Sequence, residues 1–270
     1  MEQQWRVEKP QSIDLEGVRR LEVRMVAGSV DVVGRTEDAE DGGAQVEVTE
    51  VAGALLVTLE DGTLTVAHER LTWGGLLDWV GNRRASAVVS ISVPADCPVE
   101  LGVISADAVV SGISADRTAV KSVSGDVTLD GVRSDISAQT VSGDLETRQV
   151  SGSLRFSTVS GDLTVVNGTS DTVKAESVSG NLTLDLDLGE GGRIDASSVS
   201  GDVTVRMPES AGVHVEVKTM SGSLDSAFDG MSSERRPGSS KMHGQVGTGD
   251  GRFTARTVSG DVTLLRRASV

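Results

Sequence analysis

The chain lacks the residues on which several common classes of protein depend. It has a single cysteine, Cys97, so it cannot form an internal disulfide. It has no tyrosine, and aromatic residues make up 2% of the chain, which leaves almost nothing with which to stack sugars or bases. No stretch approaches the roughly 18 apolar residues of a membrane-spanning helix. The composition therefore argues against a membrane span and against aromatic binding platforms.

The start of the chain lacks the apolar core of a signal peptide. Charged side chains interrupt it at Glu2, Arg6, Glu8 and Lys9. The last residues, LLRRASV, carry no recognisable anchor. From these two observations we expect a cytoplasmic protein.

Positive charge is also in short supply. The chain has 25 lysines and arginines against 40 aspartates and glutamates, a formal net charge of −15. Nucleic acids and anionic lipid surfaces are bound through basic patches that neutralise phosphate. The charge balance therefore argues against a nucleic-acid partner. It also argues against contact with a membrane surface, except through residues 71–84, which are described below.

No cluster of residues identifies a reaction. His68, His214 and His243 are scattered, and no catalytic Ser/His/Asp order, metal-binding Cys/His spacing or phosphate-binding loop stands out. We therefore expect a protein that is not an enzyme and needs no cofactor. Some β-helices cleave polysaccharides with aspartates in an exterior groove, so a carbohydrate-binding or carbohydrate-active protein is the alternative.

What the chain has in abundance is glycine, with 32 residues, many of them inside one repeated phrase. The phrase is clearest as SVSGDVTL at Ser122–Leu129 and as TVSGDVTL at Thr257–Leu264. Its glycines recur every 18 to 21 residues as far as Gly222, apart from a half-period copy at Gly152. The full set is Gly125, Gly143, Gly152, Gly161, Gly180, Gly201, Gly222 and Gly260. This period predicts an all-β, parallel β-solenoid in a single domain, with two strands in each coil.

Alternation within the phrase predicts which side chains face inward. If the phrase is one continuous strand, Val123, Gly125, Val127 and Leu129 share one face, and the polar residues between them share the other. The glycine has two interpretations: it permits a positive φ at a corner, or it lets the chain bend where a side chain would collide. The sequence leaves both open.

An aspartate follows the glycine in most copies of the phrase. The members are Asp126, Asp144, Asp162, Asp202 and Asp261, with Asn181 in one copy. Stacked carboxylates can bind Ca²⁺, which makes Asp126, Asp144, Asp162 and Asp202 weak metal candidates. The rest of a calcium-binding nonapeptide is missing, so we favour side chains that hydrogen-bond backbone amides around the bend. No metal is expected.

The first hundred residues predict strands of a different kind. Residues 13–33 alternate between apolar and polar side chains, as a half-buried strand does. The pair Asp61-Gly62 lies between two apolar runs and is a strong signal for a two-residue antiparallel hairpin. We therefore expect an N-terminal strand region, residues 1–100, continuous with solenoid repeats over residues 101–270.

One segment interrupts the strand pattern. Residues 71–84, LTWGGLLDWVGNRR, are apolar and can form a short helix. The favoured interpretation is a cap over the open end of the solenoid, and the alternative is a segment that docks a partner or touches a membrane surface. The candidate contact residues are Trp73, Leu76, Leu77, Trp79, Arg83 and Arg84.

The interval between Gly222 and Gly260 is about twice the usual step. Met242–Val246 copies the apolar-x-Gly-x-apolar pattern, which predicts one hidden coil in this interval. The preceding residues 231–241, rich in Ser, Arg, Pro and Gly, are expected to be a flexible surface insertion.

The repeated phrase, the segment ISVPADCPVELGV and the closing GTGDGRFTARTVSGDVTL together resemble the bacterial putative-adhesin family of β-strand-repeat proteins, a domain family of unknown function. The resemblance spans residues 13–265 and implies an all-β solenoid with an adhesive or cell-envelope role and no catalytic residues. We therefore expect a non-catalytic, acidic scaffold that binds a protein partner or associates with itself.

Overall fold

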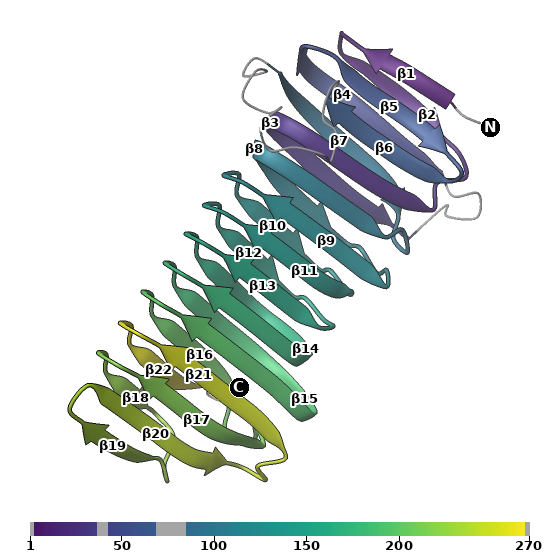
Figure 1. Ribbon diagram of the computed structural model, residues 1–270. Coiled ribbons are helices and arrows are strands. Elements are labelled where there is room, and N and C mark those ends of the chain that lie inside the picture. The colour runs from purple at the N-terminus through teal and green to yellow at the C-terminus, as the bar shows by residue number, and fades with distance from the viewer. Residues whose placement is uncertain (1–2, 37–42, 69–84, 268–270) are drawn as a thin grey trace. The chain divides into compact units, whose positions relative to one another are not determined.

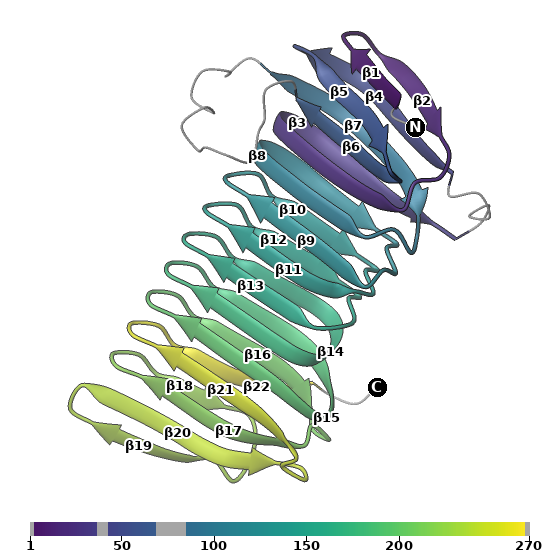
Figure 2. The same ribbon diagram turned by 45° about the vertical axis from the view of Figure 1, so that its right-hand side comes forward.

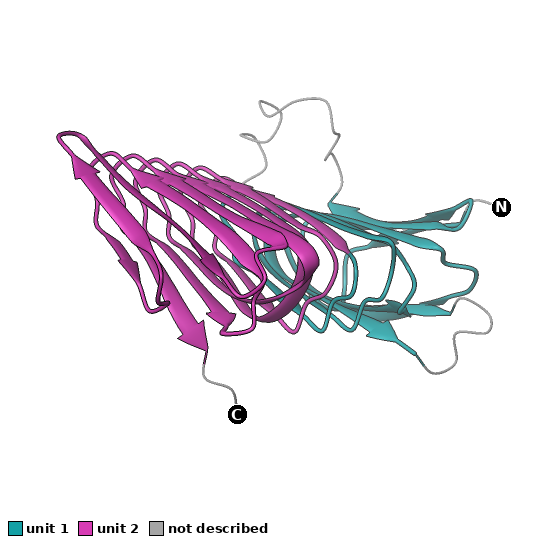
Figure 3. Ribbon diagram, turned by 90° about the horizontal axis from the view of Figure 1, so that it is seen from below, with its two compact units in different colours: residues 1–134 teal, residues 135–270 magenta. Residues whose placement is uncertain are grey.

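A computed structural model describes residues 3–36, 43–68 and 85–267 (Figure 1). These residues form strands and turns without a helix, so the all-β class is confirmed. None of the described segments is a helix long and apolar enough to cross a membrane. The predicted capping segment 71–84, with all its candidate contact residues, lies outside the described residues. The chain forms two compact units, residues 1–134 and residues 135–270, here termed the N-terminal and C-terminal units (Figure 3).

Short strands and two long ones build the described part of the N-terminal unit. They are β1 (Gln3–Val7), β2 (Gln11–Leu15), β3 (Arg20–Arg35), β4 (Ala44–Ala52), β5 (Leu55–Glu60), β6 (Thr63–His68), β7 (Ser86–Pro94), β8 (Val99–Ser111), β9 (Arg117–Ser122) and β10 (Val127–Asp130). The long strands β3 and β8 pair in parallel along their length. The first half of β8 also pairs with β9 and its second half with β10, so one long strand serves two faces of the unit.

The outer strands of this unit are antiparallel. On one face β1 pairs with β5 and β5 with β6, and on the other face β2 pairs with β4 and β4 with β7. The hairpin predicted at Asp61-Gly62 is confirmed, because these residues join β5 to β6 with φ angles of 50° and 80°. The alternation predicted for residues 13–33 is also present, with Leu21, Val23 and Met25 fully buried on β3.

A buried histidine closes β6 in the N-terminal unit. His68 is 1% exposed, and its Nδ1 atom accepts a hydrogen bond from the main-chain N–H of Val26 at 3.2 Å. Burial lowers the pKa of His68 below its usual value of 6.5, and a hydrogen bond with the backbone of Ser86 opposes part of this effect. The imidazole is therefore neutral in the folded protein at pH 7.

This lowered pKa predicts a stability that depends on pH. Below about pH 6.5 the unfolded chain takes up a proton at His68 that the folded chain resists, so the free energy of unfolding falls by up to about 1.4 kcal/mol per pH unit until the folded pKa is reached. Denaturant unfolding at pH 7.5, 6.5 and 5.5 measures this for the wild type and for His68→Gln. The stability advantage of the wild type should shrink as the pH falls. An advantage that stays constant across the three pH values would contradict the prediction.

The described part of the C-terminal unit again combines short and long strands. They are β11 (Asp135–Thr140), β12 (Leu145–Arg148), β13 (Leu154–Thr158), β14 (Leu163–Ser177), β15 (Leu182–Ser198), β16 (Val203–Pro208), β17 (Val213–Thr219), β18 (Leu224–Ser226), β19 (Ser232–Arg236), β20 (Ser239–Val246), β21 (Gly251–Thr257) and β22 (Val262–Arg267). Parallel pairing stacks equivalent positions of the repeats, such as Leu163, Leu182, Val203 and Val262. Every one of these four side chains is fully buried.

The strands of the C-terminal unit do not stack in the order of the chain. On one face β21 lies between β15 and β17 and is parallel to both (Figures 1 and 2). On the other face β22 lies between β16 and β18. The last repeat of the sequence is therefore an inner layer of the unit.

Ion pairs fix the last strand in this place. The guanidinium of Arg267 lies 3.1 Å from the carboxylate of Asp185, a largely buried group that also binds Arg206 at 2.5 Å. Arg267 forms a second ion pair with Asp187, and its neighbour Arg266 binds Glu209 at 3.1 Å. These contacts are specific to one pair of repeats, in contrast to the shared phrase.

The hidden coil predicted at Met242–Val246 is wrong. These residues belong to β20, which runs antiparallel to β17 rather than parallel as a coil would. The sequence pattern predicted one more layer of the repeat stack in this interval. Strands β21 and β22 form an inner layer of the stack instead. Residues 231–241, expected as a flexible insertion, contain β19 and the start of β20, which pair as an antiparallel hairpin. All five side chains of β19 are exposed, in keeping with a surface position.

Candidate interaction surface

Each copy of the phrase turns a corner between the two faces of its unit. In the main series of copies, the strand before the corner ends at the first Ser or Thr, and the next strand begins two residues after the glycine, as between β9 and β10. The hydroxyl of Ser122 donates to the carbonyl oxygen of Gly125 at 2.6 Å and accepts the N–H of Gly125 at 3.0 Å. Thr257 donates to the carbonyl of Gly260 at 2.8 Å in the same way. A buried hydroxyl thus closes the corner.

The corner turns one side chain to the face opposite to the one predicted. Because the first hydroxyl residue points inward, the valine that follows it points outward, so the placement of Val123 inside with Val127 and Leu129 is wrong. Val123 is partly exposed, whereas Val127 and Leu129 are buried. Prediction failed here because it assumed a continuous strand, and the strand is interrupted between the hydroxyl residue and the aspartate.

The glycines are required by a close approach between neighbouring repeats. A Cβ atom on Gly180 would overlap the carbonyl oxygen of Gly161, and one on Gly161 would overlap that of Gly143. The same holds for Gly201 over Gly180 and for Gly260 over Gly201. Among the described glycines of the phrase only Gly152 has a positive φ, of 110°. The positive-φ interpretation is therefore wrong for the main series and holds for the half-period copy.

The aspartates form hydrogen bonds from one repeat to the next. The Oδ1 atom of Asp144 accepts the N–H of Asp162 at 2.8 Å, and Asp162 accepts that of Asn181 at 2.7 Å. The series continues through Asp202 to Asp261 at 2.9 Å and ends at the N–H of Ser223 at 2.7 Å. We call this series the aspartate ladder. The carboxylates of the ladder accept hydrogen bonds from backbone amides, which is the role that we favoured from the sequence.

Three of the four weak metal candidates belong to this ladder. Asp144, Asp162 and Asp202 each use one carboxylate oxygen for a backbone N–H. In the N-terminal unit the N–H of Asp126 binds Asp107 in the same way, at 3.1 Å. Within the described part of the chain, no three His, Cys, Asp or Glu side chains converge as metal ligands would.

The outward valines form a continuous stripe along the C-terminal unit, here called the aliphatic ridge. Its members, in their order across the strands, are Val141, Val159, Val178, Val199, Val258 and Met220. Their exposed fractions lie between 44% and 59%. With strands about 4.8 Å apart, the ridge is roughly 24 Å long. The aspartate ladder follows it three residues further along each repeat.

The ridge ends at a shallow depression of about 670 Å³. Met220 and Asp261, the neighbouring members of the ridge and the ladder, line one side of it. Arg235 and Arg236 of β19 line the other. The ridge is therefore bordered mainly by carboxylates, with Asn181 in one repeat, and by two cations at one end.

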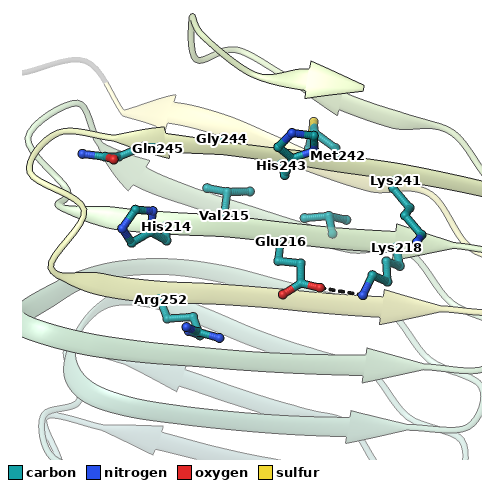
Figure 4. Close-up of a pocket in the computed structure, with 11 residues that line it drawn as sticks. His214, Val215, Glu216, Lys218, Lys241, Met242, His243, Gly244, Gln245 and Arg252 are labelled. Carbon is teal, nitrogen blue, oxygen red and sulfur yellow. Dashed lines mark hydrogen bonds and ion pairs between the residues drawn. The ribbon is translucent and has the colours of Figure 1, made fainter. Parts of the chain in front are cut away.

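A second depression, of about 570 Å³, lies on the outward face of β17 and β20 (Figure 4). His214, Lys218, Lys241 and Arg252 contribute to its lining, together with one carboxylate, Glu216. The Glu216 carboxylate accepts a hydrogen bond from Lys218 at 2.5 Å. This bond, followed by the charges of Lys218, Arg256 and Arg252, lowers the pKa of Glu216.

The single cysteine is not activated as a nucleophile. Cys97 is buried, and burial, with a smaller contribution from Asp96, raises the pKa of its thiol to about 12. It is therefore protonated at neutral pH and a poor nucleophile. His68 is buried in the N-terminal unit, whereas His214 and His243 are exposed on the adjacent strands β17 and β20 and both line the second depression.

The fold and this surface define a class, namely an all-β repeat protein whose parallel strands stack repeat upon repeat. Residues 18–265 match the model of the Toastrack DUF4097 family, a domain of unknown function, and the chain belongs to that family. The resemblance predicted from the repeated phrase is thereby confirmed. Among curated proteins no match is found.

Solved structures to which the chain is similar come from several bacteria. A putative adhesin from Bacteroides fragilis is 13% identical, with a TM-score of 0.39, and the match covers 96% of this chain and 98% of that one. A putative lipid binding protein from Parabacteroides distasonis is 10% identical, with a TM-score of 0.40 and the same coverage. A putative cell adhesion protein from Clostridium sporogenes is 11% identical, with a TM-score of 0.28, and is covered completely by 96% of this chain.

Proposed function

We propose that this protein is a non-catalytic interaction protein, an acidic β-solenoid scaffold that binds a protein partner or a second copy of itself along the aliphatic ridge. The observation that carries the proposal is the ridge, six large aliphatic side chains that stay about half exposed in adjacent repeats. Monomeric proteins expose single apolar residues freely, whereas contiguous apolar surface marks interaction sites.

The fold itself gives only a partial reason for the ridge. The valine lies outside the core, so a polar residue would satisfy the corner equally well. Stacked β-branched side chains do support each other across neighbouring strands, and that contact is the purely structural explanation. Covering the exposed half of each side chain would contribute about 1 kcal/mol, roughly half the value for complete burial. Six such side chains give a partner a substantial gain.

Threonine distinguishes the two explanations, because it keeps the β-branched shape of valine and replaces a methyl group with a hydroxyl. The triple variant Val159→Thr, Val178→Thr and Val199→Thr is expected to keep its melting temperature within a few degrees and to lose its partner. A matched control changes three exposed valines of the N-terminal unit, Val33, Val88 and Val109, which are 36–40% exposed.

Two measurements report the outcome. Size-exclusion chromatography with light scattering across concentration detects self-association, and a quantitative pull-down from native lysate compares partner recovery for the wild type and both variants. Recovery and oligomeric state should change for the ridge variant alone. Equal behaviour of the wild type and the ridge variant would refute the proposal, and so would an equal loss in the control. Specific binding on a glycan array would instead favour the carbohydrate-binding alternative.

A further inference from the structure

The outward face of four neighbouring strands of the C-terminal unit gathers positive charge. The strands are β15, β21, β17 and β20, in that order across the sheet. We call their outward cations the basic face: Arg193, Arg252, Arg256, Lys218 and Lys241. Only two carboxylates, Asp195 and Glu216, project between them in these parts of the described strands. This local excess of positive charge stands in a chain whose net charge is −15.

Like charges are direct cross-strand neighbours on this face. Arg193 lies opposite Arg252 on the adjacent strand. Lys218 lies opposite Arg256 on one side and opposite Lys241 on the other. Like charges directly opposite each other destabilise a sheet. The fold does not need this arrangement, and the repulsion between the cations opposes folding. The arrangement therefore indicates that this face binds an anion from solution.

Two cations on other strands of the same unit have acidic partners. Lys174 binds Glu176 at 2.8 Å and Arg148 binds Glu146 at 2.7 Å, each two residues along its own strand. On the basic face, Lys218 alone has such a partner, Glu216. The other four cations have no carboxylate oxygen of a described residue within 4.0 Å and keep their hydrogen-bonding groups available.

The geometry favours a long anion over a small one. Successive strands place cations about 4.8 Å apart, and Arg252 and Arg256, four residues apart on one strand, extend the face by roughly 13 Å. The depression over β17 and β20 is shallow and open, so it does not enclose a small ligand (Figure 4). Arginine forks match the geometry of phosphate oxygens. The exposed large apolar residues nearest to these cations, Val258 and Met220, lie beyond the ends of β21 and β17, and none of those described lies among the cations themselves.

We propose that the basic face binds a linear polyanion that carries phosphate groups, laid across β15, β21, β17 and β20. Several phosphates contact several cations at once and relieve the repulsion between neighbours. Affinity should therefore increase with the length of the chain and fall steeply with salt, because each phosphate contact releases counterions. This function is separate from partner binding at the aliphatic ridge.

The test uses the full chain and labelled long-chain inorganic polyphosphate, followed by fluorescence anisotropy at 50 to 300 mM salt. The variant Arg252→Gln with Arg256→Gln is expected to bind at least tenfold more weakly at about 50 mM salt, with a salt slope reduced by about one to two. The control, Arg133→Gln with Arg148→Gln, removes the same charge at exposed positions outside the four strands of the basic face and should bind within twofold of the wild type. Thermal unfolding confirms that both variants are folded.

Each other outcome counts against the proposal. Absence of wild-type binding at 50 mM salt would overturn it, as would an equal loss in both variants, which indicates attraction by total charge. Pyrophosphate that competes as well as polyphosphate at equal phosphate concentration would show a small-anion site instead. Phosphatidylglycerol vesicles that bind when polyphosphate does not would replace the polyanion with a lipid surface.

Discussion

Ending the chain after Asp250 is expected to unfold much of the C-terminal unit rather than to shorten it from one end. The deletion removes β21 and β22, which lie between other strands on both faces. Phe253, Val262 and Leu264 of these strands are fully buried. At about 1.5–3 kcal/mol for each buried side chain, their loss approaches the whole stability of a typical domain.

Hydrogen exchange measured by mass spectrometry locates the damage. Residues 213–246 should lose protection, because β17 keeps no parallel neighbour, while residues 145–177 should keep more of theirs. A peptide of residues 251–267 added in trans should restore protection, since it refills a defined gap. Removal of Ser232–Arg236 serves as a control, because β19 is outermost and fully exposed and its loss should leave residues 213–219 protected. Unchanged protection of residues 213–246 in the truncated chain would contradict the strand order.

The features that sequence predicted well have local causes. The spacing of Gly161 and Gly180 predicted that the copies of the phrase stack, whereas the close approach of their backbones was not predicted, because the sequence left the role of the glycine open. Asp162 accepts a backbone N–H that each repeat supplies at the same position. The Asp61-Gly62 turn depends only on two residues that tolerate positive φ. Repetition made these local requirements visible.

The order of the strands could not be predicted, because it does not depend on the residues of the repeated phrase. Because all copies of the phrase are alike, TVSGDVTL can stack on any other copy with the same register. The discrimination comes from residues outside the phrase, such as the pairing of Arg267 with Asp185, 82 positions apart. Nothing in a single sequence indicates that these two side chains pair.

The sequence did not reveal the two candidate surfaces, because they depend on the order of the strands and on the geometry of the corner. The basic face exists because β21 places Arg252 and Arg256 beside β15 and β17, so the charge balance of the whole chain concealed it. The aliphatic ridge depended on the corner, where a buried hydroxyl such as that of Thr257 turns the next side chain outward. The hydroxyl residue that recurs before each outward valine was the available signal, and the assumption of strict alternation along a continuous strand obscured it.

Replacing Gly180 with valine should be among the most destabilising single substitutions in the C-terminal unit. Its Cβ would overlap the carbonyl oxygen of Gly161, a backbone atom that cannot turn aside. The repeats would have to separate where Ser179 donates to the carbonyl of Val159 at 2.8 Å and Asn181 donates to Asp162 at 2.7 Å. Overpacking costs about 1–3 kcal/mol and strained hydrogen bonds about 1 kcal/mol each, so we expect a loss of about 3–5 kcal/mol.

Thermal unfolding followed by circular dichroism measures this loss, which corresponds to a decrease in melting temperature of roughly 10 °C or more for a unit of this size. Ser179→Val is the matched control, because it introduces the same side chain one residue away at an exposed position. It should change the stability by no more than about 0.5 kcal/mol. If both variants melt at the same temperature, close approach between repeats is not the reason for glycine. A loss confined to Gly180→Val identifies the backbone contact between adjacent repeats as the constraint that makes the phrase recur.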